Sequence, residues 1–126
     1  MNVFVVDDAH EIRKRLVAML RRVADVNVVG EAESVQGAIE GLNATAVDVV
    51  LLDLQLTDGN GLSVLAAVKP QRPGLRVIVL SNFANTQYRE ASLAAGADVF
   101  LDKSKEFGRV PTILRGWLDA ANARVA

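Results

Sequence analysis

Hydrophobic residues gather in five short runs along the chain, separated by longer stretches of mixed character. The third run, V-D-V-V-L-L-D-L, is almost continuously apolar and does not alternate with polar residues. A continuous run is typical of a strand that is covered on both faces, as in a parallel sheet. The five runs occupy residues 3–6, 26–29, 47–54, 75–80 and 99–101.

Between the runs, hydrophobic residues recur every three or four positions, which is the spacing of an amphipathic helix. The last helical stretch is the clearest, and Pro111 lies in its first turn, where proline is tolerated. The stretch over residues 86–95 is the weakest, because we expect its inner face to be Ala91, Ala94 and Ala95, which bury little area and hold a helix less rigidly. The other stripes are Ile12, Leu16, Leu20 and Val23; Val35, Ile39 and Leu42; Leu62, Leu65 and Val68; and Val110, Ile113, Leu114, Trp117, Leu118 and Ala121.

Strand-like runs and helix-like stretches therefore alternate along the whole chain. Such alternation predicts right-handed crossovers and an α/β fold, in which helices cover both faces of a parallel sheet. No change of composition, repeat or low-complexity segment divides the chain, and its 126 residues suit one compact domain. We expect a doubly wound (βα)5 fold in which residues 1–126 form a single domain.

Composition excludes several classes of protein. Hydrophobic residues make up 51% of the chain, which is enough for a core and too many for a disordered segment. Because there is no cysteine and one histidine, the chain cannot form a disulfide, a thiolate metal site or a multi-histidine metal site. The net charge of −1 is unlike that of a basic nucleic-acid-binding domain, so we expect no direct contact of this domain with nucleic acid.

The chain also lacks the sequence features of membrane and exported segments. No apolar run approaches the roughly 18 residues of a membrane-spanning helix. The N-terminal apolar stretch has no positive region before it and reaches acids by position 7, unlike a secretion signal. We therefore expect a soluble, cytoplasmic protein without a membrane partner.

Polar side chains follow four of the five predicted strands, at the point where each strand ends. In an open α/β sheet, ligands bind outside the carboxyl ends of the strands, so these side chains are expected to converge on one edge. They are Asp7 and Asp8 after the first run, Asp53 near the end of the third, Ser81 after the fourth and Lys103 after the fifth.

The residue types at this edge indicate phosphoryl chemistry with a metal ion. Three close carboxylates cannot all remain ionised in a partly dry site without a cation, and oxygen ligands beside a phosphate favour Mg²⁺. Lys103 is a point charge suited to phosphate oxygens, and the Ser81 hydroxyl can donate to the same group. Asp53, on the central strand, is the best candidate for a carboxylate nucleophile that forms an acyl phosphate.

At this point the chain resembles the receiver domains of bacterial two-component response regulators, the CheY-like superfamily. The resemblance covers essentially the whole chain, and its motifs occur in order at the predicted strand ends. It implies a flavodoxin-like receiver fold with strand order 2-1-3-4-5. The motifs are V-V-D-D at 5–8, L-L-D-L-Q-L-T-D-G-N-G at 51–61, V-L-S-N at 79–82 and G-A-D-V-F-L-D-K-S at 96–104.

The resemblance implies a role for each residue of the site. Asp53 would accept a phosphoryl group from a histidine kinase, a phosphotransfer protein or a small phosphodonor. The domain itself would catalyse this transfer and the later dephosphorylation, without being a conventional turnover enzyme. Asp8, Asp53 and the backbone carbonyl of Gln55 would bind Mg²⁺ directly, and Asp7 would act through metal-bound water. Lys103 would bind the acceptor carboxylate and then a phosphoryl oxygen.

The resemblance also implies a conformational switch. Ser81 would move inward to hydrogen-bond the phosphoryl group, and Phe100, at the switch-aromatic position, would turn inward with it. Phosphorylation adds roughly −1.5 to −2 charges and three acceptor oxygens, so the loops after the fourth and fifth strands must shift to meet them. That shift would change the surface formed by the fourth helix, fifth strand and fifth helix.

Several positions near the site depart from the family pattern or vary within it. Thr57 stands where the family commonly has proline, which permits a looser loop. Ser81 replaces the commoner threonine. Gln55 and Phe83 occupy variable positions that influence the lifetime of the phosphoryl group, and an apolar Phe83 would hinder the hydrolytic water.

Other polar residues near the motifs have simpler interpretations. We expect His10 to be exposed in the first turn of the first helix, Asp48 to flank the third strand and Asp58 to be a turn residue. We expect Asp102 to be solvated, with no ligand role. The basic residues of the first helix (Arg13, Lys14, Arg15, Arg21 and Arg22) form either a solvated face or a partner contact.

Two other functions stay open from the sequence. A pseudo-receiver would bind partners without being phosphorylated, although the complete set of acids, serine and lysine argues against it. A small hydrolase with an aspartyl nucleophile would need a second acid at position 55, where Gln55 stands. The L-S-N-F stretch and the loop after Asp53 look most like receivers attached to helix-turn-helix DNA-binding domains. The chain would thus be a stand-alone receiver or part of a longer DNA-binding regulator, with homodimerisation open in either case.

Overall fold

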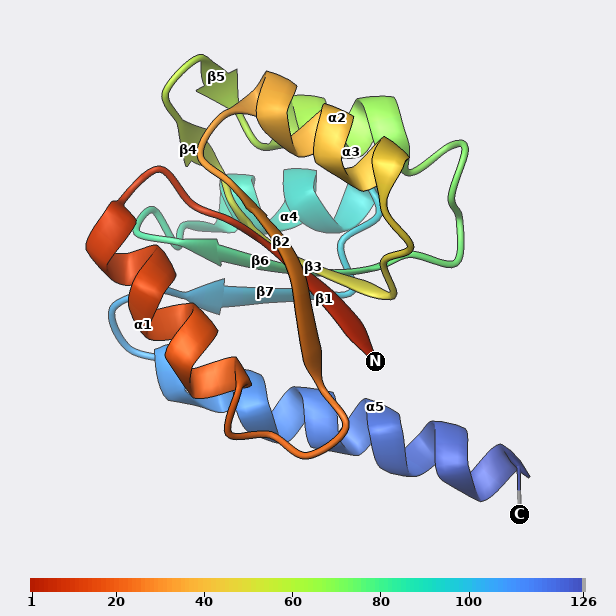
Figure 1. The fold of residues 1–126 in the computed structure, drawn as a ribbon. Helices are drawn as coiled ribbons and strands as arrows, with labels where there is room; N and C mark the ends of the chain where they lie inside the picture. The colour runs from red at the N-terminus through yellow and green to blue at the C-terminus, as the bar shows by residue number, and fades with distance from the viewer. Residues whose placement is uncertain (126) are drawn as a thin grey trace.

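The structure, a computed structural model, describes residues 1–125. Five strands form one parallel sheet in the order β2-β1-β3-β6-β7 (Figure 1). Once the short hairpin strands β4 and β5 are set aside, this is the predicted 2-1-3-4-5 order, which is confirmed. The strands are β1 (Asn2–Val6), β2 (Asn27–Ala32), β3 (Val49–Asp53), β6 (Arg76–Ser81) and β7 (Val99–Asp102), and the hairpin is β4 (Gln55–Leu56) and β5 (Gly59–Asn60).

Helices cover both faces of the sheet. In Figure 1, α1 and α5 lie below the sheet, and α2, α3 and α4 lie above it. The doubly wound α/β class predicted from the alternation is therefore confirmed. The helices are α1 (His10–Leu20), α2 (Val35–Ala44), α3 (Leu62–Val68), α4 (Thr86–Ala94) and α5 (Val110–Val125), with a 3₁₀ turn (Phe107–Arg109) before α5.

The continuous apolar runs are explained by two hydrophobic clusters, one on each face of the sheet. Along β1, Val3 and Val5 pack into the cluster beneath α1 and α5, whereas Phe4 and Val6 pack into the cluster beneath α2 and α3. Successive side chains of a strand point to opposite faces, so both sets must be apolar when both faces are covered. The strand β2 lies at the sheet edge and carries the more polar sequence N-V-V-G-E-A, which is why the predicted run at 26–29 missed its last three residues.

Phe4 is packed against two glycines on different elements. Gly30 of β2 and Gly41 of α2 both lie against the Cε2–Cζ edge of the ring. A Cβ atom added at Gly41 would lie 2.5 Å from Phe4 Cζ, well inside van der Waals contact. The two glycines therefore provide the space for a large, nearly fully buried aromatic side chain.

The predicted inner face of the fourth helix is wrong in its details. Ala91 and Ala94 are exposed, and the inner stripe is Tyr88, Ser92 and Ala95. The Asn85 side chain caps the helix by accepting from the Tyr88 N–H, and the residues four and seven positions after Tyr88 then face the sheet. The expected low burial is confirmed, because Ser92 is the one fully buried residue of α4, and its hydroxyl has no hydrogen-bond partner within the described part of the chain.

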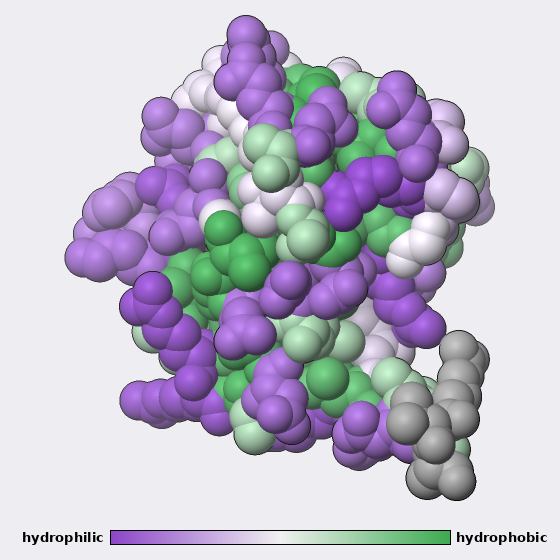
Figure 2. Space-filling model, turned by 45° about the vertical axis from the view of Figure 1, so that its right-hand side comes forward, coloured by the Kyte–Doolittle hydropathy of each residue, from purple (hydrophilic) through white to green (hydrophobic). Residues whose placement is uncertain are grey.

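The surface is predominantly polar. Figure 2 shows hydrophilic side chains over much of one face, with hydrophobic atoms visible between them. Among the large hydrophobic side chains, Phe83 and Leu93 are exposed, and both lie in or just before α4. Within residues 1–125, no helix is both long enough and apolar enough to cross a membrane.

Candidate functional site

The structure brings the three selected acids together at the carboxyl edge of the sheet. Asp7 directly follows β1, Asp53 is the last residue of β3, and Asp8 begins the loop that leads to α1. Carboxylate oxygens of the three residues lie within 4.8 Å of one another. Asp7 and Asp53 are buried, whereas Asp8 is exposed to solvent. The cluster thus has two acids fixed in the protein and one at its mouth.

Strand register accounts for this convergence. β1 and β3 are adjacent and parallel, and Val6 pairs with Leu52, so the residues that follow each strand emerge side by side. On the other side of β3, Asp53 pairs with Leu80 of β6, and the next residue of β6 is Ser81. Parallel neighbours end at the same edge, so separate stretches of sequence deliver their polar residues to one place.

Lys103 enters the cluster from the loop after β7. Its Nζ lies 3.2 Å from Asp53 Oδ2 and also forms an ion pair with Asp7 Oδ2. All three side chains are at least nine-tenths buried, and the Lys103 backbone N–H donates to the Ser81 carbonyl at 2.9 Å. The contact of Lys103 with the Asp53 carboxylate agrees with the expectation, and the pairing with Asp7 was not anticipated from the sequence.

The electrostatics of the cluster favour an added cation. Burial raises the pKa of the Asp53 carboxyl above its ordinary value, and the nearby Asp7 charge raises it further. The Lys103 ammonium and the Gln55 N–H, which donates to Asp53 Oδ1 at 3.1 Å, oppose this rise in pKa. Three ionised carboxylates and one ammonium leave two negative charges, which a divalent ion would neutralise. An all-oxygen donor set of this kind fits Mg²⁺.

Ser81 and Phe100 lie beside the cluster, and both are buried. The Ser81 hydroxyl oxygen accepts a hydrogen bond from the Phe83 N–H at 3.0 Å, so it is held by its own loop. Phe100 packs in the core, and the Arg89 guanidinium lies 5.2 Å from its ring centroid. Phe100 is buried in this structure, and its expected movement on phosphorylation stays a prediction.

The hairpin after Asp53 is tied to the start of α2. Asp58 Oδ1 accepts from the Val35 N–H at 2.6 Å, and Asp58 Oδ2 accepts from the Gln36 N–H at 3.2 Å. Thr57 Oγ1 donates to the Glu33 carbonyl at 3.3 Å, so the residue that replaces the family's proline makes a contact of its own. The interpretation of Asp58 as a simple turn residue is therefore incomplete, and no local sequence pattern could have shown a partner so far along the chain.

Arg13 is a second residue whose role the sequence did not show. Its Nη1 donates to the Asp7 carbonyl at 2.7 Å, and its Nε pairs with Glu31 of β2 at 3.2 Å. Its side chain is only 13% exposed, so Arg13 does not belong to a solvated basic face, whereas Lys14 and Arg15 are exposed. His10 is exposed as predicted, and its Nδ1 lies 3.2 Å from Arg13 Nη2.

Gly61 allows the chain after the hairpin to approach the backbone of Asp53. Its N–H donates to the Leu54 carbonyl at 2.7 Å, and a Cβ atom at this position would collide with the backbone carbonyl of Asp53. The helical φ of −58° shows that glycine is needed here for this close approach and not for its conformational freedom. A larger residue would displace the backbone that carries Asp53.

Asp48 and Asp102 serve local structure. Asp48 directly precedes β3, as expected, and accepts a hydrogen bond from the Asn2 N–H. Asp102, which was expected to be solvated, is half-buried and accepts hydrogen bonds from the hydroxyl and the N–H of Ser104, which hold the pKa of its carboxyl below the usual value.

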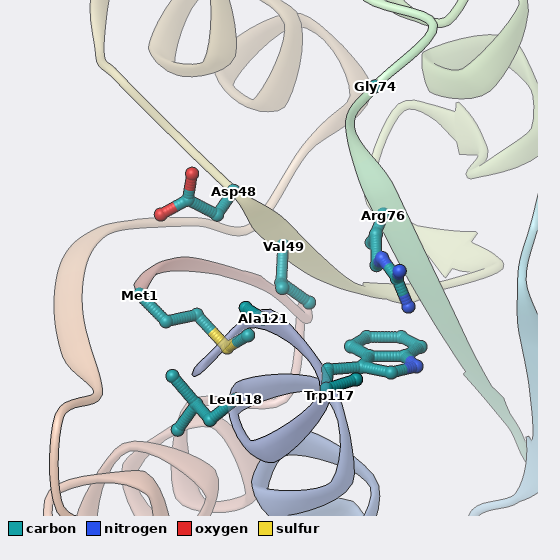
Figure 3. Close-up of a pocket in the computed structure, with 9 residues that line it drawn as sticks. Met1, Asp48, Val49, Gly74, Arg76, Trp117, Leu118 and Ala121 are labelled. Atoms are coloured by element: carbon teal, nitrogen blue, oxygen red, sulfur yellow. The ribbon is translucent and has the colours of Figure 1, made fainter. Parts of the chain in front are cut away.

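A hollow of about 360 Å³ lies at the other end of the sheet (Figure 3). It is bounded by residues at the amino ends of β3 and β6 and by the later part of α5, whereas the acids lie at the carboxyl ends of the strands. The Arg76 guanidinium lies over the Trp117 ring, 4.7 Å from its centroid (Figure 3). The hollow shares no residue with the acidic cluster, so the cluster is the candidate site for phosphoryl chemistry.

Comparison with known proteins shows which proteins the chain is similar to. Residues 3–115 match the family model described as the response regulator receiver domain. The chain is 34% identical over 103 residues to the DNA-binding transcriptional activator DevR/DosR of Mycobacterium tuberculosis, covering 82% of this chain and 48% of that protein. It is 30% identical over 106 residues to the uncharacterized transcriptional regulatory protein YhcZ of Bacillus subtilis, covering 84% of this chain and 50% of that protein. The chain thus spans about half the length of the curated relatives it matches.

Solved structures give the same result. The signal receiver domain of the putative response regulator NarL from Mycobacterium tuberculosis superposes with a TM-score of 0.81 at 34% identity, covering 96% of this chain and 95% of that chain. The response regulator domain of Thermotoga maritima CheB superposes with a TM-score of 0.82 at 27% identity, with the same coverage of the two chains.

Proposed function

Because the chain belongs to the response regulator receiver domain family, we propose that it is a phosphorylatable receiver of a two-component system, with Asp53 as the phosphoacceptor. The observation that carries this proposal is the buried contact of Lys103 with both Asp53 and Asp7 in a cluster that keeps excess negative charge. A cluster with a purely structural role would gain no stability from a third acid beside the two that pair with Lys103. A site that must receive a phosphoryl group requires both the nucleophile and the counter-charges.

The chemistry assigned to these residues is transfer from a phosphohistidine of a histidine kinase or phosphotransfer protein. A carboxylate oxygen of Asp53 attacks phosphorus, the P–N bond breaks, and the imidazole leaves with its electron pair and takes up a proton. Lys103, already beside Asp53 Oδ2, stabilises the charge on the phosphoryl oxygens. Ser81 would exchange its bond with the Phe83 N–H for one to the phosphoryl group.

Mg²⁺ is the cofactor that this donor set favours. Asp8, Asp53 and the backbone carbonyl of Gln55 would hold it directly, and Asp7, already paired with Lys103, would act in the outer shell. When bound, the ion would neutralise charge that develops on the phosphoryl group. The exposed position of Asp8 suits a ligand at the mouth of the cluster, where an ion enters from solvent.

The output would be a change in the surface formed by α4, β7 and α5. Phosphorylation adds charge that Ser81 and Lys103 must meet, and both loops lead into this surface. α4 is suited to move, because Ser92 is its one fully buried residue. The relatives' names point to a DNA-binding output domain in a longer chain, and homodimerisation through this surface is part of the same proposal.

Phosphorylation can be tested by intact mass spectrometry after incubation with acetyl phosphate and Mg²⁺. We expect one added phosphoryl group, which is lost when Mg²⁺ is chelated or when Asp53 is changed to Asn. The matched control is Asp119→Asn, which changes an exposed carboxylate on α5 and should leave the adduct intact. Absence of an adduct would support an unphosphorylated interaction module instead. An adduct that survives Asp53→Asn would refute Asp53 as the phosphoacceptor.

A further inference from the structure

Residues 31–36 contact both loops that carry the acids. They comprise the last two residues of β2, the two-residue connection and the first two residues of α2. One of these loops runs from Asp7 to α1, and the other is the β4–β5 hairpin that follows Asp53. The two loops come from different strands, and residues 31–36 bond to each of them. We call residues 31–36 the β2–α2 brace.

On the first loop, the backbone N–H and the backbone carbonyl of Asp7 are both linked to the brace by hydrogen bonds. The Asp7 N–H donates to the Ala32 carbonyl at 3.0 Å. The Asp7 carbonyl accepts from Arg13, which is itself paired with Glu31. This carbonyl belongs to the peptide that joins Asp7 to Asp8. Within residues 1–125 no hydrogen bond of the Asp8 side chain is present, so this peptide sets where Asp8 lies.

On the second loop, Asp58 holds the hairpin against the first turn of α2. Its two carboxylate oxygens accept from the Val35 and Gln36 N–H groups, while Ser34 accepts from the next free amide, that of Gly37. These amides are the otherwise unpaired donors at a helix N-terminus, where a negative charge is also stabilised by the helix dipole. The Val35 and Gln36 hydrogen bonds hold the pKa of the Asp58 carboxyl below its ordinary value.

We propose that the β2–α2 brace positions the two acid-bearing loops relative to each other, and that Arg13 and Asp58 are positioning residues for the metal site. The inference rests on the proposed function, because it concerns how that site binds Mg²⁺. Mg²⁺ demands near-ideal octahedral geometry, and its protein ligands here would come from both loops. A residue that orients a ligand without touching the metal typically changes metal affinity by roughly 10- to 100-fold when it is removed.

Charge and positioning predict opposite results for Arg13, which makes it the decisive variant. Arg13→Ala removes a positive charge near three carboxylates, and on charge alone Mg²⁺ should then bind more tightly. If Arg13 positions Asp8, the same change should weaken Mg²⁺ binding by roughly tenfold. Lys14→Ala is the matched control, because it removes the same charge from an exposed neighbouring position on α1. Arg13→Lys keeps the charge but loses the forked contacts, so its affinity should lie between those of the wild type and the alanine variant.

The experiment measures the Mg²⁺ dissociation constant of the full chain by isothermal titration calorimetry, with thermal melting of each variant alongside. We expect weaker binding in Arg13→Ala at a melting temperature close to that of the wild type, and unchanged or slightly tighter binding in Lys14→Ala. Asp58→Ala should also weaken binding, and Asp58→Asn, which keeps an acceptor oxygen, should recover part of the loss.

Hydrogen exchange gives a second readout that does not depend on phosphorylation. If the hairpin and the brace are coupled through Asp58, Mg²⁺ should slow exchange of the Val35 and Gln36 amides in the wild type but not in Asp58→Ala. The proposed role of the brace would be refuted if Arg13→Ala bound Mg²⁺ with wild-type affinity, or if Mg²⁺ did not change the exchange rate of these amides in the wild type. Either result would leave the proposed function standing. A wild-type chain that binds no Mg²⁺ would overturn both.

Discussion

Replacing Gly41 by alanine should destabilise the chain, even though alanine is the better helix former. Gly41 lies inside α2, where the change would ordinarily stabilise by about 1 kcal/mol. The added Cβ, however, would lie 2.5 Å from Phe4 Cζ, whereas comfortable carbon contacts lie near ~3.5–4.0 Å. The ring has little room to move, because Phe4 is only 3% exposed and also lies against Gly30.

The expected magnitude follows from these two opposing effects. Overpacking of a tight core typically destabilises by about 1–3 kcal/mol, and about 1 kcal/mol of helix propensity offsets it. Gly41→Ala should therefore lower the free energy of unfolding by about 1 kcal/mol. In a Phe4→Leu background the Cζ atom is gone, and Gly41→Ala should become stabilising by up to about 1 kcal/mol. The coupling energy between the two positions would then be about 2 kcal/mol.

Urea unfolding followed by far-UV circular dichroism measures all four proteins of this cycle. Gly116→Ala is the matched control, because that glycine lies in α5 and has open space where the Cβ would go, so helix propensity acts alone. If Gly41→Ala stabilised the chain equally with Phe4 and with Leu at position 4, the steric argument would be refuted.

Three further predictions concern charges. Because burial raises the pKa of Asp53, its ionised form destabilises the fold above that pKa, so Asp53→Asn should raise the melting temperature at pH 7. The difference in melting temperature should shrink as pH falls through the raised pKa toward the ordinary value of 3.8, below which the acid is protonated in both the folded and the unfolded chain. A difference in melting temperature that stays constant with pH would contradict this prediction. Arg72 donates to three backbone carbonyls, one in the last turn of α2 and two just after it. Arg72→Ala should therefore lower the free energy of unfolding by roughly 2–3 kcal/mol, measured by urea unfolding, whereas a change at the exposed Arg115 to Ala should alter it little. Asp8→Ala should abolish Mg²⁺-dependent phosphorylation more completely than Asp7→Ala, measured as the rate of adduct formation, and equal losses would remove the distinction between direct and outer ligand.

The geometry of the acidic cluster depends on the packing of the core as much as on the polar residues of the cluster. Asp53 and Lys103 are buried at strand ends, so their distance is set by the pairing of β3, β6 and β7. The glycine at position 61 then lets the following helix start directly against the Asp53 backbone. Chemistry at this edge therefore has a rigid base, while the residues that would respond to it lie in α4 and the neighbouring loops.

The sequence by itself determined the order of strands and helices and the edge where the acids meet. Both follow from signals that are local or nearly so, namely the period of the hydrophobic pattern and the polar residue at each strand end, combined with the rule for parallel crossovers. For this reason the sequence alone could select the candidate site residues, which are Asp7, Asp8, Asp53, Ser81 and Lys103.

The tertiary structure alone decided which polar side chains support the site. In the sequence, Asp58 resembles any turn aspartate, and only the structure shows that α2 begins beside it. Arg13 likewise resembles any exposed helix arginine, and only the structure shows that it contacts Glu31 and the Asp7 carbonyl. The inner face of α4 was missed for a related reason, because the helix start at Asn85 sets which residues face the sheet. Such contacts join residues far apart in the chain, and their partners are fixed by how whole elements pack, which no local pattern of residues records.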